Sequence, residues 1–244
     1  MAVKPFASSA DAGAKEQTLE VLADGVYALT AEGDPNLGAI EGDDFLVCFE
    51  ALATPVAAAR WLAKLREHTD KPVRYLVLSH YHAVRVLGAS AFDAEVIVSS
   101  ETTKRLIDER GQQDWESEYG RMPRLFEEAE SIPGLTRPTM TFRDKLTIGL
   151  GGDRGDLVLE FLGRGHTEGD IVAWLPKQEI VFAGDLVESQ AALYTGDAFH
   201  LEWAAGTLDR IKALGAQQLV GGRGAIARGS NEVDAAVEQT PYVA

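Results

Sequence analysis

Two histidines spaced one residue apart, His80 and His82, have the residue type and spacing of metal ligands. They follow residues 75–78, Tyr-Leu-Val-Leu, an apolar run that is typical of a buried strand. Two imidazoles that leave the end of one strand can reach the same metal ion. The sequence therefore indicates a metal site where this strand ends.

The segment around these histidines resembles the first signature of the metallo-β-lactamase fold superfamily, His-x-His-x-Asp-His-x-Gly-Gly. Residues 79–88 read Ser-His-Tyr-His-Ala-Val-Arg-Val-Leu-Gly, so both spaced histidines match. Val84 stands where the family has aspartate, and Arg85 stands where it has a third histidine. The match is therefore partial at this signature.

Three further segments resemble the family's other signatures. Residues 163–170, Gly-Arg-Gly-His-Thr-Glu-Gly-Asp, match the pattern Gly-x-x-His-Thr-x-Gly-Asp at every defining position and make His166 the third candidate ligand. Residues 181–185, Val-Phe-Ala-Gly-Asp, correspond to the strand whose final aspartate, here Asp185, touches both metals in the family. Where the family has Pro-Gly-His-Gly, residues 221–224 read Gly-Gly-Arg-Gly.

The resemblance sorts these matches and replacements by metal site. All three histidines of the first metal site are present: His80, His82 and His166. Every replacement falls in the second metal site: Val84, Arg85 and Arg223. Undirected decay would rarely spare one triad and erase the other. We therefore expect a mononuclear descendant with one zinc ion per chain, and with iron or manganese as alternatives.

Three neutral imidazoles leave one open position on a tetrahedral zinc ion, which is the arrangement of a catalytic site. Zinc lowers the pKa of a bound water to around 7 and also polarises carbonyl oxygens. Asp185 is expected either to accept the proton of that water or to be a fourth ligand, and the sequence leaves both roles open.

Arg85 and Arg223 cannot bind a cation, but their guanidinium groups are permanently charged and fork onto carboxylates. With Asp185 they form the predicted catalytic group. We expect one arginine to pair with Asp185 and the other to bind an anionic group, which favours an acidic substrate. The alternative is that both arginines only fill space and pair with Asp185 or with Glu50, which occupies the place of a supporting aspartate in the family.

Composition narrows the class of partner. The chain has 244 residues, 45% of them hydrophobic, with a net charge of −15 and a pI near 4.7. This acidity argues against nucleic-acid or anionic-membrane surfaces and favours a small-molecule substrate. The sequence has no apolar run long enough for a membrane span and no signal-peptide core, so we expect a cytoplasmic protein, with homo-oligomerisation left open. The single cysteine, Cys48, lies in an apolar run and is predicted to be core.

The order of predicted elements favours an α/β fold. We expect a flexible tail over residues 1–18 and one domain over residues 19–244. Two strand-rich blocks alternate with helices, which agrees with the αββα sandwich of two mixed sheets flanked by helices that the resemblance implies. Residues 100–130 read as a mostly helical excursion, either a lid over the pocket or a surface helix pair. Tyr81, Tyr194, His200 and Trp203 lie near the predicted site and are interpreted as packing residues.

The leading functional hypothesis is a mononuclear metal-dependent hydrolase that acts on a small, acidic ester, lactone, thioester or amide. A second hypothesis is a non-catalytic metal- or ligand-binding scaffold of the same fold. A third is a redox enzyme that holds iron on the same three histidines, because imidazole suits iron as well as zinc.

Overall fold

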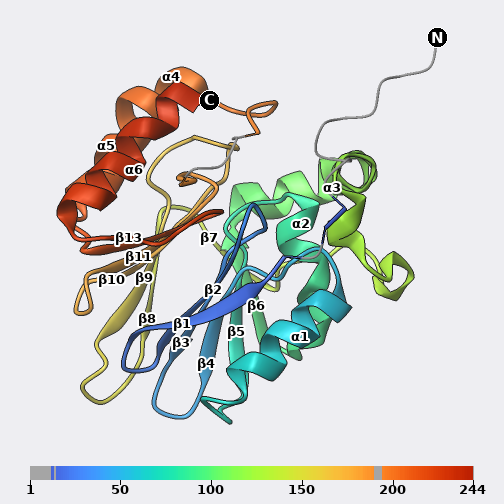
Figure 1. The fold of residues 1–244 in the computed structure, drawn as a ribbon, viewed down its shortest axis with the longest axis horizontal. Helices are drawn as coiled ribbons and strands as arrows, with labels where there is room; N and C mark the ends of the chain where they lie inside the picture. The colour runs from blue at the N-terminus through green and yellow to red at the C-terminus, as the bar shows by residue number, and fades with distance from the viewer. Residues whose placement is uncertain (1–11, 14, 190–193, 244) are drawn as a thin grey trace.

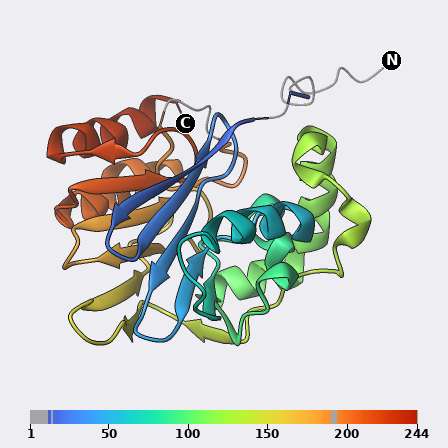
Figure 2. The same ribbon diagram turned by 60° about the horizontal axis from the view of Figure 1, so that its bottom comes forward.

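Two β-sheets pack face to face, and helices cover the outer face of each (Figures 1 and 2). The computed structural model describes residues 12, 13, 15–189 and 194–243. The first half of the chain forms one sheet with its helices, and the second half forms the other. The predicted αββα sandwich is confirmed.

The first sheet has the strand order β1-β2-β3-β4-β5-β6-β7, antiparallel from β1 to β4 and parallel from β4 to β7. Its strands are β1 (Gln17–Ala23), β2 (Val26–Ala31), β3 (Leu37–Glu41), β4 (Leu46–Phe49), β5 (Val73–Val77), β6 (Val96–Ser100) and β7 (Met140–Phe142). The helical segments of this half are α1 (Pro55–Leu65), α2 (Ala83–Val86), α3 (Glu101–Arg121) and the 3-10 turns η2 (Leu87–Phe92), η3 (Pro123–Phe126) and η4 (Ala129–Ser131).

The second sheet has the order β13-β12-β11-β10-β9-β8, in which only β11 and β12 run parallel. Its strands are β8 (Lys145–Gly149), β9 (Asp156–Glu160), β10 (Val172–Leu175), β11 (Ile180–Gly184), β12 (Gln218–Gly221) and β13 (Ala227–Arg228). Its helices are α4 (His200–Glu202), the π-helical η5 (Trp203–Thr207), α5 (Leu208–Ala213) and α6 (Ser230–Val243). None of the helices in the described ranges is long and apolar enough to cross a membrane.

Period-two alternation along the central strands explains why they are apolar on both faces. In β4, Cys48 packs with α1 in the outer core, whereas Phe49 points between the sheets. In β11, Phe182 points between the sheets and Val181 packs outward against α5 and α6. The prediction that Cys48 is a core residue is confirmed.

Several boundaries differ from those that the sequence predicts. Gln17 and Thr18 already belong to β1, so the predicted tail is two residues too long, and most of that tail lies outside the described residues. Strand β3 was not predicted, because its sequence Leu-Gly-Ala-Ile-Glu contains glycine and lacks a polar-apolar alternation. Residues 100–130 form one long helix followed by two short turns, rather than a helix pair.

The candidate site residues lie where central strands end. Strands β4 and β5 are parallel. Strand β4 leads into Glu50, and β5 leads into the histidine loop, which carries His80 and His82. Strands β11 and β12 are also parallel and lead into Asp185 and Arg223. Neighbouring parallel strands end at the same edge of their sheet. The topology therefore gathers these residues at one edge of the sandwich.

Removing the Phe182 ring tests the packing between the sheets. Its ring centroid lies 5.8 Å from that of Phe49, and a Cβ on Gly38 would collide with it. Phe182→Ala is expected to lower the free energy of unfolding by about 3–5 kcal/mol, measured by urea denaturation, because the cavity would be fully buried. Leu201→Ala is the control, since its side chain is 87% exposed, and should change stability by less than about 0.5 kcal/mol. Equal effects of the two would contradict this packing.

Candidate metal centre

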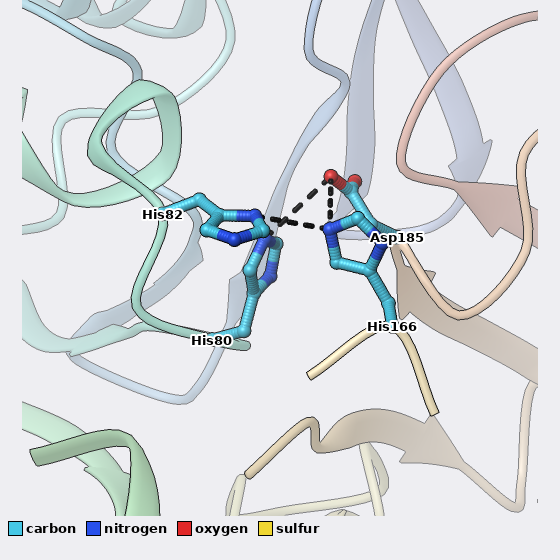
Figure 3. A group of neighbouring side chains, drawn as sticks. All are labelled: His80, His82, His166 and Asp185. Carbon is cyan, nitrogen blue, oxygen red and sulfur yellow. Dashed lines mark hydrogen bonds and ion pairs between the residues drawn. The ribbon is translucent and has the colours of Figure 1, made fainter. Parts of the chain in front are cut away.

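The four residues predicted as metal ligands come together in the structure (Figure 3). Nδ1 of His82 lies 3.0 Å from Nε2 of His166. Oδ2 of Asp185 lies 3.5 Å from Nε2 of His166 and 3.6 Å from Nε2 of His80. All four side chains are buried, and their ligand atoms lie within 4.8 Å of one another.

This cluster fits a metal ion by two observations. Ligand atoms bound tetrahedrally to zinc at about 2.0–2.1 Å are about 3.3 Å apart. Three of the pairs in the cluster, at 3.0, 3.5 and 3.6 Å, lie close to that value, and all of its ligand atoms lie within 4.8 Å of one another. Nε2 of His80 is buried, faces the cluster and has no hydrogen-bond partner in the described part of the chain. A buried nitrogen without a partner is costly, and a metal ion would satisfy it.

His80 and His82 each present a defined ring nitrogen to the cluster because the other ring nitrogen contacts a polar side chain, whereas Nδ1 of His166 has no hydrogen-bond partner among the described residues. Nδ1 of His80 lies 2.7 Å from the Ser79 hydroxyl, which leaves Nε2 toward the cluster. Nε2 of His82 lies 3.3 Å from Oδ2 of Asp197, which leaves Nδ1 toward the cluster. The ring of His166 lies beside that of Trp203, with centroids 6.0 Å apart.

The protonation states of the three imidazoles differ. Burial holds the pKa of His80 well below its usual range and lowers that of His166 to about 3, so both rings are neutral at pH 7, as metal ligands must be. Burial also acts to lower the pKa of His82, but its hydrogen bond with Asp197 and the nearby charge of Asp114 raise it to about 9. Metal binding would therefore displace a proton from His82.

The loop that carries His166 is closed by Asp170. Oδ2 of Asp170 accepts a hydrogen bond from the backbone N–H of Thr167 at 2.6 Å, and Oδ1 accepts one from its hydroxyl at 3.1 Å. These bonds explain the His-Thr-x-Gly-Asp pattern structurally, because they fix the turn in which His166 lies. Burial raises the pKa of Asp170 to about 7.

Arg85 pairs with Asp185, as one of the sequence hypotheses requires. Its Nη2 donates to Oδ1 of Asp185 and, at 2.8 Å, to the carbonyl of Gly222, and its Nη1 donates to the carbonyl of Asn36 at 3.2 Å. The Arg85 side chain is fully buried. Burial alone would raise the pKa of Asp185, but Arg85, His80 and Arg223 together hold it below its usual range, so the carboxylate is ionised.

Arg223 has a carboxylate partner in the structure and is not unpaired, whereas binding of an anionic substrate group by one of the arginines stays a prediction. Its Nη1 donates to Oε1 of Glu188 at 2.8 Å and lies 3.6 Å from Oδ2 of Asp185, and its Nε donates to the carbonyl of Gly33 at 3.1 Å. Glu188, which follows β11 by four residues and is fully buried, was not predicted from the sequence. Both guanidinium groups therefore have carboxylate partners.

Glu50 lies close to this network but does not pair with either arginine. Its side chain is fully buried, and neither carboxylate oxygen has a hydrogen-bond partner among the described residues. Burial raises its pKa to about 8, although the nearby charge of Arg85 opposes this. The carboxyl group of Glu50 therefore holds its proton to a higher pH than an ordinary glutamate does. The hypothesis that the arginines pair with Glu50 is wrong, and the alternative pairing with Asp185 holds.

Helix α3 reaches the site through two carboxylates, Asp114 and Glu118, that were not among the residues predicted at the site. Oδ2 of Asp114 accepts the backbone N–H of Ala83 at 2.7 Å, and Oε2 of Glu118 accepts that of Val84 at 2.8 Å. Both acids thus cap the short helix α2. Their spacing of four residues continues a buried face that begins with Ile107 and Gly111 and could have revealed them.

The aromatic residues and His200 divide into three kinds. Trp203 is buried, and its Nε1 donates to the carbonyl of Leu186 at 3.1 Å, so it is packing as predicted. His200 is exposed. Tyr81 donates to Asp197, and the Tyr194 ring lies 5.6 Å from that of His82 with its side chain 38% exposed, so both lie at the site itself.

The family of the chain follows from its sequence match together with this geometry. Residues 31–222, more than half of the chain, match the Lactamase_B family, the metallo-β-lactamase superfamily. The chain belongs to the metallo-β-lactamase superfamily. Its members with solved structures share the fold at low identity. The metallo-β-lactamase FIM-1 from Pseudomonas aeruginosa in its mono-zinc form is 21% identical, with a TM-score of 0.70 over 93% of this chain and 95% of that one.

Other members of the superfamily are also similar to this chain, either in fold or over part of the sequence. A metallo-β-lactamase from Pontibacter korlensis is 20% identical with a TM-score of 0.73, over 93% of this chain and 99% of that one. A type 2 metallo-β-lactamase from Bacteroides fragilis is 39% identical over 83 residues, which are 33% of this chain and 32% of that protein. One from a Bacillus strain is 26% identical over 146 residues, 59% of this chain and 48% of that protein. The sequence matches thus span between about a third and a half of these relatives.

Alanine substitution tests the ligand set. Each of three variants is expected to lose the metal on dialysis: His80→Ala, His82→Ala and His166→Ala. Two imidazoles and one carboxylate hold zinc far more weakly than three imidazoles and one carboxylate do. His68→Ala is the matched control: it removes a histidine whose ring stacks near Tyr27, away from the cluster, and should keep the metal. Elemental analysis after dialysis measures both. Full metal content in the three ligand variants would place the metal elsewhere.

Proposed function

We propose that this chain is a mononuclear metal-dependent hydrolase that cleaves a small carbonyl compound. The observation that carries the proposal is the buried convergence of three imidazoles and one carboxylate, with ligand atoms within 4.8 Å of one another, in a member of a hydrolase superfamily. When bound there, zinc would supply an activated water at neutral pH and would polarise the substrate carbonyl. Iron or manganese on the same donors is the alternative metal.

The proposal of one metal rests on what surrounds Asp185. Arg85 donates to Oδ1 of Asp185, and Nη1 of Arg223 lies 3.6 Å from Oδ2, so both guanidinium groups contact the carboxylate that would bridge two ions in the family. Guanidinium groups stay charged at all accessible pH values and cannot ligate a cation. Two positive charges and no imidazole at this position favour a single ion on the histidine side.

Asp185 has a divided role in this proposal. Its Oδ1 is held by Arg85, whereas Oδ2 points at the histidine cluster and is available to a ligand or a proton. Because the arginines keep the carboxylate ionised, it offers negative charge at every pH of interest, but its lowered pKa makes it a weak proton acceptor. We propose that Asp185 orients the attacking water and accepts its proton.

The substrate class is proposed as a small ester, lactone, thioester or amide. The matched relatives are named as β-lactamases, so cyclic amides belong in the first screen. The acidic composition of the chain supports a small molecule rather than a nucleic acid as partner. A panel of chromogenic substrates of these four bond classes, assayed with metal-replete protein and with the His166→Ala variant, tests the proposal. Turnover that persists in the variant would come from a contaminant.

Metal stoichiometry tests the mononuclear proposal. We expect close to one transition-metal ion per chain after dialysis. A triple variant that restores the family's residues, Val84→Asp with Arg85→His and Arg223→His, is expected to bind two ions per chain, because it removes both guanidinium groups and adds three donors. Elemental analysis and titration with cobalt measure both. Two ions in the unmodified protein would overturn the proposal.

Replacing Asp185 tests its catalytic role. Asp185→Asn keeps the shape of the side chain but removes its charge, and kcat at saturating zinc is expected to fall about 100-fold, the lower end of the about 10²–10⁴ range for general bases because the lowered pKa makes this carboxylate a weak one. Zinc affinity is measured in parallel. A kcat restored to the unmodified value by added zinc would show that Asp185 acts only as a ligand.

A further inference from the structure

Asp197 collects three hydrogen-bond donors beside the metal centre. Oδ2 accepts from the Tyr81 hydroxyl and lies 3.3 Å from Nε2 of His82, and Oδ1 accepts from Nη2 of Arg110 at 2.8 Å. Tyr81 and His82 come from the histidine loop, and Arg110 comes from α3. A single carboxylate in the segment after β11 is thus held from two other elements.

The position of Asp197 decides which nitrogen of His82 faces the cluster. Nδ1 of His82 lies 3.0 Å from Nε2 of His166, and Nε2 lies on the opposite edge of the ring toward Asp197. A hydrogen bond from Nε2–H to a carboxylate keeps the proton on Nε2 and the lone pair on Nδ1. Only this tautomer and ring orientation direct the lone pair into the cluster.

Asp114 is another carboxylate near this ring, but it has a different role. Its Oδ1 lies 3.9 Å from Nε2 of His82, beyond hydrogen-bond distance, and its Oδ2 accepts the backbone N–H of Ala83 at 2.7 Å. Asp114 therefore holds the start of α2. Asp197 is the carboxylate that contacts His82 directly.

We propose that Asp197 is the positioning residue that makes His82 a metal ligand through Nδ1, and that Tyr81 and Arg110 hold Asp197 in place for this purpose. The inference rests on the metal binding in the proposed function and not on hydrolysis. A ligating histidine that donates its other N–H to a carboxylate is fixed in orientation and becomes a more basic ligand, and loss of such a partner costs about 10–100-fold in metal affinity.

Substituting Asp197 tests the proposal by metal affinity in the full-length protein. Asp197→Asn removes the charge while keeping the size, and its Kd for Zn²⁺, measured by competition with a chromophoric chelator, is expected to rise about 10–100-fold. Asp197→Glu restores a carboxylate and is expected to recover part of the loss. Asp108→Asn is the matched control, since Asp108 also pairs with an arginine, Arg137, at 2.9 Å and lies on α3 away from the cluster. Its Kd should match that of the unmodified protein.

The absorption spectrum of bound Co²⁺ provides a readout that a purely structural role would not change. The d–d bands of the Asp197→Asn variant are expected to shift relative to those of the unmodified protein, because the His82 ligand loses its fixed orientation, whereas the Asp108→Asn spectrum should not shift. Far-UV circular dichroism checks that the fold is kept. If Asp197→Asn does not fold, Zn²⁺ affinity is measured in Tyr81→Phe instead. This variant loses one hydrogen-bond donor to Asp197 and should bind Zn²⁺ more weakly than the unmodified protein, by a smaller factor than that expected for Asp197→Asn.

The outcomes separate this inference from the proposed function. If the unmodified protein binds no metal, the proposed function itself fails. If the unmodified protein binds Zn²⁺ and both Asp197 variants bind it with the same Kd and the same Co²⁺ spectrum, the metal site stands and Asp197 does not position His82. A loss in Asp197→Asn that Asp197→Glu partly restores supports the proposal.

Discussion

A buried ion pair between the two halves of the chain, Arg85 with Asp185, is the interaction on which the site depends. Arg85 belongs to α2 in the first half, and Asp185 ends β11 in the second. Burying two charges costs several kcal/mol each, and attraction between them repays this only when their other hydrogen bonds are also made. Arg85 makes them to the carbonyls of Gly222 and Asn36, so atoms from both halves complete its shell. The contact between Arg85 and Asp185 therefore joins the two halves of the chain and also sets the charge state of the site.

The backbone around this pair is shaped to admit it. A Cβ on Gly222 would collide with Oδ1 of Asp185 and would lie 2.8 Å from Nη2 of Arg85, so only glycine lets the guanidinium reach both acceptors. Gly184 has a φ of +54°, which a side chain would strain, and this turn aims Asp185 back toward the histidines. Asn36 closes the arrangement: its backbone N–H donates to the Gly222 carbonyl at 2.7 Å, and its side chain donates to that of Gly221 at 3.0 Å. The loops that end β11 and β12 are thus fixed by the first half of the chain.

The sequence predicted the αββα sandwich and the four residues of the cluster, because long apolar strands and short signature loops are local patterns. It did not predict the partners that set their charge and orientation. Glu188 and Asp197 lie in segments without periodicity, and only the folded chain brings Asp197 to His82 across 115 residues. Asp114 and Glu118 carried a usable signal, since their spacing places them on the buried face of α3, but acidic residues on a helix normally face water. The prediction of an unpaired arginine failed for the same reason, because its partner Glu188 could not be seen.

In the proposed site with one metal ion, the network of charges takes the place of the second ion that the family pattern provides for. A second metal ion would keep Asp185 ionised, but only while the ion stays bound. Acid or a chelator would remove it. Arg85 and Arg223 keep the same carboxylate ionised, and their charge cannot be removed by deprotonation. Glu188 balances the second guanidinium, which opposes the rise in pKa that burial and the charge of Asp185 give the Glu188 carboxyl group. The histidine side is thereby left as the place where an ion is needed: Nε2 of His80 is buried there without a hydrogen-bond partner among the described residues, and the Oδ2 atom of Asp185 that faces it is already charged.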